Sequence, residues 1–252
     1  HSQYMVRHYR KVVETAAKYH ITLDVHEPIK DTGIRRTWPN MMTREGARGQ
    51  EYNAWSPDGG NPPAYLTIIP FTRMLAGPFD YTPGIFDIYF DDYKPKNRVN
   101  HTLAKELATY VVIYSPLQMA ADLIENYENQ PAFNFIKDVP VDWEYTRVIH
   151  ARIGDYVTIA RKDRHNNEWY IGSVTDENPR LLKAKLDFLE SGQSYVAEIY
   201  ADAADAHWED NPLAIEISKK LVDKDTDILL KLAPGGGKAI RIRPATAEGF
   251  RL

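Results

Sequence analysis

The sequence of 252 residues contains no cysteine. This absence excludes disulfide bonds, thiolate metal sites and a cysteine nucleophile. Long hydrophobic runs are also lacking, because the best candidate, LATYVVIY at residues 107–114, falls well below the roughly 18 apolar residues that span a bilayer. No basic cluster is present and the net charge is −4. We therefore expect no membrane span and no nucleic-acid partner.

The first residues, HSQYMVRHYRKVV, show no secretory leader. Apolar residues recur at three- and four-residue steps from Tyr4 to Tyr19, which predicts an amphipathic helix. The next stretch, ITLDVHE, alternates Ile21, Leu23 and Val25 and predicts a strand. A helix followed by a short buried strand is one unit of a parallel α/β sheet. Because the sequence opens in mid-helix, we expect that the chain begins inside a larger protein.

The middle of the chain is less regular. Residues 66–77, LTIIPFTRMLAG, predict a strand that runs into a loop. Residues 102–114 predict a helix, Pro116 would start a second helix that ends near residue 126, and residues 132–137 predict a further helical turn.

Strand patterns dominate from residue 145 onward. They are TRVIHARI, DYVTIARKD, EWYIGSVT, RLLKAKLDF, SYVAEIYADA, DILLKL and KAIRIRP. The stretch RHNNE at residues 164–168 predicts a hairpin turn between two of them. Regularly spaced strands favour a small antiparallel β-sandwich. We place a domain boundary near residue 140, which gives domains at 1–140 and 141–252.

A long loop after the first strand, ITLDVHEPIKDTGIRRTWPNMMTREGARGQE, carries three glutamates. Glu27 ends the predicted strand, and the carboxyl ends of strands face the active site in a (β/α)₈ barrel. Together with Glu45 and Glu51, it could surround Ca²⁺, which prefers oxygen ligands. Two of the three could instead be a glycosidase acid and base. The arginines around them could equally neutralise all three as surface ion pairs.

Other apparent motifs do not predict sites. DKDTD at residues 223–227 mimics the start of a calcium loop, but Ile228 and Pro234 occupy the positions that require Gly and Glu. APGGGKA lacks the spacing of a phosphate loop and predicts a hairpin turn. His101 and His150 lack partner ligands nearby in sequence, so we expect structural roles for both.

The glutamate-bearing loop as a whole resembles a known family. VHEPIKDTGIRRTWPNMMTREGARGQEYNAW resembles the catalytic region of glycoside hydrolase family 97, which comprises α-glucosidases and α-galactosidases. PFTRMLAGPFDYTPGIF resembles the next signature of that family. VNHTLAKELATYVVIYSPLQMAADLIENY and DVPVDWEYTRVIHARIGDYVTIARK are similar to its last barrel helices and C-terminal domain. The resemblance covers essentially the whole chain.

The resemblance implies a fold and a location. Enzymes of the family have an N-terminal β-supersandwich, a (β/α)₈ TIM barrel and a small C-terminal β-sandwich. This chain would then be α/β, with a partial (β/α)₈ barrel (its second half) at 1–140 and the antiparallel sandwich at 141–252. The missing N-terminal region of the same protein would be its partner. The family also implies a periplasmic location.

The resemblance also implies residue roles. Glu51 matches the general acid, and Glu45 matches a calcium-binding glutamate. Glu27 matches a glutamate of the inverting members that belongs to the general-base machinery and touches calcium, and His26 matches a substrate-contacting position. The prediction is therefore that Glu51 and Glu27 are catalytic, that His26 and Glu27 bind substrate, and that Glu27, Glu45 and Glu51 ligate Ca²⁺. Retaining members resemble this pattern but have glycine at the Glu27 position and an aspartate nucleophile elsewhere.

The implied function is an exo-acting, inverting, calcium-dependent α-glucosidase acting on oligosaccharides. One alternative is a retaining α-galactosidase of the same family. Another is a non-catalytic fragment that binds sugar or calcium, because half a barrel exposes sheet edges. The sequence departs from the family at Asp31, where proline is expected, and at Phe79, where methionine is expected. A second base glutamate and another calcium ligand are expected upstream of His1.

Overall fold

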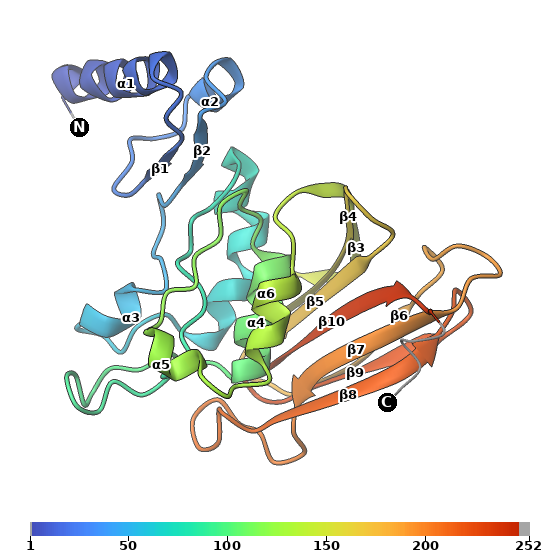
Figure 1. Cartoon of the computed structure of the whole chain (residues 1–252). Coiled ribbons are helices and arrows are strands. Elements are labelled where there is room, and N and C mark those ends of the chain that lie inside the picture. Colours follow the sequence, from blue (N-terminus) through green and yellow to red (C-terminus); the bar gives the residue numbers. More distant parts are fainter. Residues whose placement is uncertain (1, 247–252) are drawn as a thin grey trace.

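A computed structural model describes residues 2–246 (Figure 1). The helices are α1 (Gln3–Lys18), α2 (Ile34–Thr37), α3 (Tyr52–Trp55), α4 (Leu103–Val112), α5 (Ile124–Tyr127) and α6 (Phe133–Asp138), with 3₁₀ helices η1 (Pro63–Thr67), η2 (Ile69–Phe71) and η3 (Arg73–Ala76). The strands are β1 (Leu23–Val25), β2 (Met41–Arg44), β3 (Trp143–Arg152), β4 (Tyr156–Asp163), β5 (Trp169–Thr175), β6 (Arg180–Lys185), β7 (Tyr195–Asp202), β8 (Ile215–Val222), β9 (Asp227–Leu232) and β10 (Gly237–Pro244). Within residues 2–246, no helix has the length and apolar character needed to cross a bilayer.

The first helix and strand form as predicted. The Ser2 side chain accepts a hydrogen bond from the Met5 N–H at 3.5 Å and caps α1, while Val13 and Ala16 are buried on its inner face. Strand β1 pairs in parallel with β2, which lies inside the segment expected to be a loop. Two parallel strands are consistent with part of a barrel wall, although they do not by themselves form a barrel.

The segment between β2 and α4 differs from the prediction. Residues 66–77 are not a strand but fall largely within consecutive 3₁₀ helices, and Pro70 in η2 has no N–H to donate to a strand ladder. The helix expected from Pro116 to about residue 126 is reduced to α5. Side chains compete for backbone groups there: Ser115 Oγ donates to the Leu117 carbonyl at 2.6 Å and Gln118 Nε2 to the Ile113 carbonyl at 2.8 Å.

The C-terminal part contains a six-stranded antiparallel sheet in the order β3-β4-β5-β10-β7-β8. Strands β6 and β9 form a second, two-stranded antiparallel sheet, and a hydrophobic core with Ile171, Leu230 and Ile240 joins the two sheets. Each of the seven predicted strand patterns forms a strand, in agreement with a sandwich-like domain. Strand β8 was not predicted. APGGGKA is a turn but not a hairpin, because β9 and β10 belong to different sheets.

Helix α4 connects the sheet to the remainder of the molecule and lies at its centre in Figure 1. All ten of its residues are buried, and it packs against β5 and β10. Glycines in these strands permit the approach: a Cβ at Gly172 would lie 2.6 Å from the Ala108 carbonyl oxygen, and one at Gly237 would lie 2.5 Å from Lys105 Cα. One hydrophobic core therefore extends across residue 140. The division into 1–140 and 141–252 remains a prediction.

A lysine is fully buried in the contact between α4 and the sheet. Lys105 Nζ donates to the carbonyl oxygens of Pro63 and Thr175 at 2.6 and 2.7 Å. Burial lowers the pKa of Lys105 to about 7, and nearby carboxylates only partly offset this effect. The lysine thus joins η1, α4 and β5 through one side chain.

Replacing this lysine by methionine (Lys105→Met) is expected to remove a pH dependence of stability. Between pH 7 and 10.5 the unfolded lysine retains a proton that the folded one has lost. The unfolded state therefore binds more protons, and the wild-type free energy of unfolding rises with pH by up to about 1.4 kcal/mol per pH unit from this group. Urea unfolding at pH 7 and pH 9 should show the wild-type advantage over the variant growing with pH. A constant difference would contradict the prediction.

Candidate active site

Because β1 and β2 pair in parallel, the carboxyl ends of the two strands lie side by side. Val25 is opposite Arg44, and the Glu45 N–H donates to the Val25 carbonyl at 3.0 Å. His26 and Glu27 follow β1 directly, and Glu45 follows β2 directly. Three of the four predicted site residues therefore lie at the carboxyl edge of the parallel pair, which is where barrel enzymes carry their chemistry.

The neighbouring arginines do not neutralise the three glutamates. Arg44 pairs with Asp31 at 3.1 Å, and Arg48 lies 3.6 Å from Asp58. Arg73 donates to backbone carbonyls, including that of Glu45. Within residues 2–246, neither arginine nor lysine forms an ion pair with any of the three glutamates predicted to form the site. Their carboxylates stay available for other partners.

Two of the glutamates converge on a histidine. Ligand atoms of His26, Glu45 and Glu51 all lie within 4.8 Å of one another. His26 Nδ1 is 3.5 Å from Glu51 Oε1. Glu27 joins this cluster through its backbone, because its N–H donates to Glu45 Oε2 at 3.1 Å, whereas its carboxylate is not among the converging groups of residues 2–246. The roles assigned to His26, Glu27, Glu45 and Glu51 from sequence remain predictions.

An aspartate that the sequence did not single out supports the histidine. Asp80 is 1% exposed, and its Oδ2 is hydrogen-bonded to His26 Nε2 at 2.6 Å. Burial lowers the pKa of His26, but the hydrogen bond and the charge of Asp80, with Glu45 and Glu51, outweigh it and raise that pKa overall. Asp80 thus fixes the orientation of the ring and favours its protonated form.

A second aspartate lies beside the first. Asp24, His26 and Asp80 form another group of converging ligand atoms. Burial and the charge of the neighbouring Asp80 carboxylate raise the pKa of Asp24 to about 7. The Asp24 carboxyl therefore keeps its proton up to near neutral pH.

The cluster has the right chemistry for calcium. Glu45 and Glu51 supply carboxylate oxygens, which Ca²⁺ binds at about 2.3–2.6 Å, so two such oxygens can be separated by up to about 5 Å. The observed spacing within 4.8 Å meets this requirement. His26 offers a nitrogen, a poor ligand for a hard cation, and its other nitrogen is engaged with Asp80. Glu45 and Glu51 would hold the ion.

His101, His150 and the DKDTD stretch are features that were not predicted to form sites. His101 is buried, with its Nε2 2.5 Å from Glu106 Oε2, and burial lowers its pKa. His150 is half-buried, and burial lowers its pKa as well. Asp223 accepts a hydrogen bond from Thr226 Oγ1 at 2.7 Å and stabilises an exposed turn.

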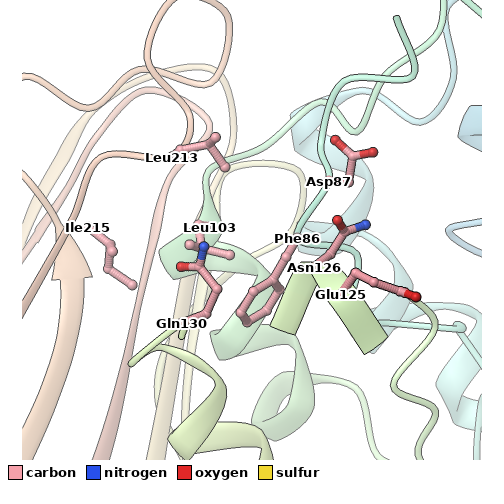
Figure 2. Close-up of a pocket in the computed structure, with 8 residues that line it drawn as sticks. All are labelled: Phe86, Asp87, Leu103, Glu125, Asn126, Gln130, Leu213 and Ile215. Carbon is pink, nitrogen blue, oxygen red and sulfur yellow. The ribbon is translucent and has the colours of Figure 1, made fainter. Parts of the chain in front are cut away.

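Among residues 2–246, two of the cavities border the C-terminal sheet and lie away from the cluster. One of about 290 Å³ opens between α5 and the start of β8 (Figure 2) and is lined by Phe86, Asp87, Leu103, Glu125, Asn126, Gln130, Leu213 and Ile215. The other, of about 480 Å³, lies over the six-stranded sheet. Its cations are paired: Arg241 with Asp138 at 2.6 Å, and Arg243 with Glu198 at 3.1 Å. Neither cavity includes His26, Glu27, Glu45 or Glu51.

Two models of one family match the chain. "Glycoside hydrolase 97" matches residues 1–47, which contain His26, Glu27 and Glu45. "Glycosyl-hydrolase 97 C-terminal, oligomerisation" matches residues 142–243, a range that begins one residue before β3. The chain belongs to glycoside hydrolase family 97. The family expected from the sequence is thereby confirmed.

Solved structures of family 97 are similar throughout. A family 97 enzyme from Pseudoalteromonas sp. strain K8 in complex with panose is 49% identical, with a TM-score of 0.92, over 97% of this chain and 38% of that chain. Its complex with acarbose is 50% identical over the same shares, with the same TM-score. A β-arabinopyranosidase structure, 21% identical with a TM-score of 0.75, shares the fold.

A curated relative is named as a retaining α-galactosidase. The "Retaining alpha-galactosidase" of Bacteroides thetaiotaomicron is 34% identical over 240 residues, which cover 92% of this chain and 35% of that protein. The chain therefore spans little more than a third of the length of these relatives.

Proposed function

We propose that this chain is part of an inverting, calcium-dependent α-glucosidase, to which it contributes the general acid. The observation that carries this proposal is the convergence of Glu45 and Glu51 on His26 at the carboxyl edge of a parallel strand pair. Saccharide complexes of relatives that are 49–50% identical support an oligosaccharide substrate. The chain alone would be an incomplete catalytic unit that needs its upstream region. A periplasmic location is part of the proposal and rests on the family resemblance.

The proposed reaction assigns a step to each carboxylate. An inverting glycosidase protonates the leaving oxygen on one side of the sugar and activates water on the other, with the two carboxyls about 6.5–9.5 Å apart. Glu51 would donate the proton, and Glu27 would act in the base machinery with an upstream glutamate. The positively charged transition state is stabilised by nearby carboxylates. His26, held by Asp80, would contact the substrate in a fixed orientation.

Calcium would be held by Glu45 and Glu51, with Glu27 as the third predicted ligand. When bound, the ion supplies positive charge that orients carboxylates and polarises the oxygens it contacts. Two hydrogen bonds would hold Glu45 in position before an ion binds. The Glu27 N–H donates to Glu45 Oε2, and Arg73 donates to the Glu45 carbonyl. A carboxylate fixed in this way loses little freedom on binding an ion.

The backbone at Glu27 supports a functional role for this residue. Its φ of 47° is left-handed, a conformation that glycine adopts freely and other residues adopt at a cost of about 1 kcal/mol. The glycine expected here in retaining members would fit the same backbone without strain. Strain kept at a polar residue is typical of functional positions. The second candidate, a retaining α-galactosidase, is favoured by the curated relative at 34% identity.

The stereochemistry of the product tests the proposal. The protein with its natural upstream region is assayed on p-nitrophenyl α-glucoside and α-galactoside, and the first-formed anomer is followed by NMR. We expect turnover of the glucoside with β-glucose as the first product. An α-anomer as the first product would exclude inversion, and an α-anomer together with preference for the galactoside would replace this proposal by the retaining α-galactosidase.

The same assay tests the metal. A chelator is expected to lower the rate at least tenfold, and added Ca²⁺ should restore it, because Glu45 and Glu51 lose their common partner when the ion is removed. Isothermal titration of the chelated protein with Ca²⁺ gives an independent readout, and Glu45→Gln should weaken binding. A chelated protein with full activity and no calcium heat would exclude the ion from the proposal.

A further inference from the structure

We propose that Glu106, a buried glutamate of α4, is a positioning residue for the general acid. It binds both chain segments whose side chains meet at the cluster: the one that carries Glu51 and the one that carries Asp80. This inference rests on the proposed function, in which Glu51 donates the proton. It adds an α4 residue, far from the cluster in sequence, to the group of residues on which proton transfer depends.

The Glu106 carboxylate is fully buried and accepts three hydrogen bonds. Gln50 Nε2 donates to Oε2 at 2.8 Å, and the Gly84 N–H donates to Oε1 at 2.5 Å. His101 Nε2 lies 2.5 Å from Oε2, and because burial keeps this histidine neutral, its N–H can donate to the carboxylate. Such charge-assisted bonds in a buried setting are stronger than neutral ones and hold their partners in one arrangement.

The hydrogen bond from Gln50 to Glu106 restrains the general acid Glu51 through the adjoining backbone. Gln50 precedes Glu51, is 1% exposed, and its own N–H donates to the Tyr81 carbonyl at 2.7 Å. The Glu51 N–H in turn points at Thr82 Oγ1, at 3.4 Å. Helix α3, which follows Glu51, is only four residues long and cannot anchor the acid alone. The position of the Glu51 backbone is therefore set by Glu106 and by the segment 81–82.

The hydrogen bond from the Gly84 N–H to Glu106 restrains the segment that carries Asp80. Gly84 ends the segment that starts at Asp80, and Thr82 within it has a φ of 57°. A Cβ on Gly84 would lie 2.6 Å from the Tyr110 hydroxyl of α4, so this segment is pressed against the helix. Asp80 binds His26, which approaches Glu51 at 3.5 Å. Glu106 thus holds two segments that meet again at the Glu51 side chain.

Another buried carboxylate provides a matched control. Asp202 accepts from Thr102 Oγ1, the Ala233 N–H and the Gly237 N–H at 2.6, 2.8 and 2.9 Å. It also borders α4, but its hydrogen bonds do not reach the segments 50–51 or 80–84. Replacing either carboxylate by its amide disturbs three hydrogen bonds at a buried site. Only Glu106 is connected to the acid.

The test compares substrates that differ in their need for an acid. In the protein with its upstream region, Glu106→Gln is assayed on an oligosaccharide, whose leaving group must be protonated, and on the glycosyl fluoride of the same sugar, whose leaving group need not be. We expect kcat on the oligosaccharide to fall about 10- to 100-fold, as slight misplacement of a catalytic group does. The oligosaccharide KM and the fluoride rate should change less than about threefold. Asp202→Asn should affect both substrates equally.

The outcomes separate this inference from the proposed function. Glu51→Gln is assayed alongside; if it shows no preference for the fluoride, the proposed acid is wrong. If Glu51→Gln shows the preference and Glu106→Gln loses both activities equally, as Asp202→Asn does, only the positioning role is overturned. Should Glu106→Gln fail to fold, Gln50→Met removes a single donor from the same carboxylate and is judged by the same ratio of rates.

Discussion

Glu51→Gln is expected to reduce kcat on unactivated oligosaccharides by about 10²–10⁴-fold, the range that general acid catalysis contributes. Glutamine keeps the size of the side chain but carries no proton that it can transfer to the leaving oxygen. Because Glu51 is half-exposed and its backbone is held by neighbouring segments, the substitution should leave the fold intact. The measurement is steady-state kinetics of the protein with its natural upstream region.

The control for this loss is Glu128→Gln, a change of an exposed glutamate remote from the cluster in sequence. It should retain the wild-type rate, which shows that loss of a surface carboxylate does not itself lower activity. Thermal unfolding of both variants should match the wild type within about 2 °C. An oligosaccharide rate for Glu51→Gln within a factor of three of wild type would remove this residue from the role of acid.

Gly172→Ala is expected to destabilise the protein by about 3 kcal/mol. The added methyl group would lie 2.6 Å from the Ala108 carbonyl oxygen and 2.8 Å from Val111 Cβ, closer than packed atoms approach. Helix α4 is buried along its whole length and has no free side toward which to retreat. Overpacking of this kind typically costs about 1–3 kcal/mol, and the backbone contact places it at the upper end. Denaturant unfolding compares the variant with the wild type.

Gly154→Ala separates the steric effect from the loss of a glycine. Gly154 joins β3 to β4 with a φ of 84°, and a Cβ there meets no atom within 4 Å. The alanine at this position adds only the strain of a left-handed backbone, which lowers the free energy of unfolding by about 1–2 kcal/mol. The loss at Gly172, whose φ carries no such penalty, should exceed it. If Gly172→Ala is as stable as wild type, α4 is not held as closely to the sheet as the structure indicates.

Apolar patterns in the sequence predicted the first helix and most strands of the C-terminal part. Helix α1 and the strands β3 to β7, β9 and β10 repeat apolar residues regularly, and each formed where it was expected. Strand β8 was not predicted because six of its eight residues are exposed at the sheet edge, so its sequence shows no regular alternation of apolar residues. The short strand β2 was not predicted either, because it lies within the segment expected to be a loop. The failures at residues 66–77 and 116–126 arose where prolines and side-chain hydrogen bonds outweighed propensity.

The candidate site was predicted in part. His26, Glu45 and Glu51 come from one loop, and the sequence identified them before the fold brought their side chains together. Asp80 and Glu106 had no comparable signal, because 54 and 56 residues separate them from the partners they bind, His26 and Gln50. Only the tertiary fold brings such partners into contact. The roles themselves came from resemblance, since spacing left surface pairing equally open.

Helix α4 has one face on the glycines of β5 and β10 and another that presents Glu106 to the loop before Glu51. A recombination event that exchanged the C-terminal sheet for one from a distant relative would therefore also change the surface on which the helix rests. The sheet and the loop should accumulate compensating substitutions together. Through α4 the sheet and the loop before Glu51 are joined structurally, even though the sequence suggests two modules.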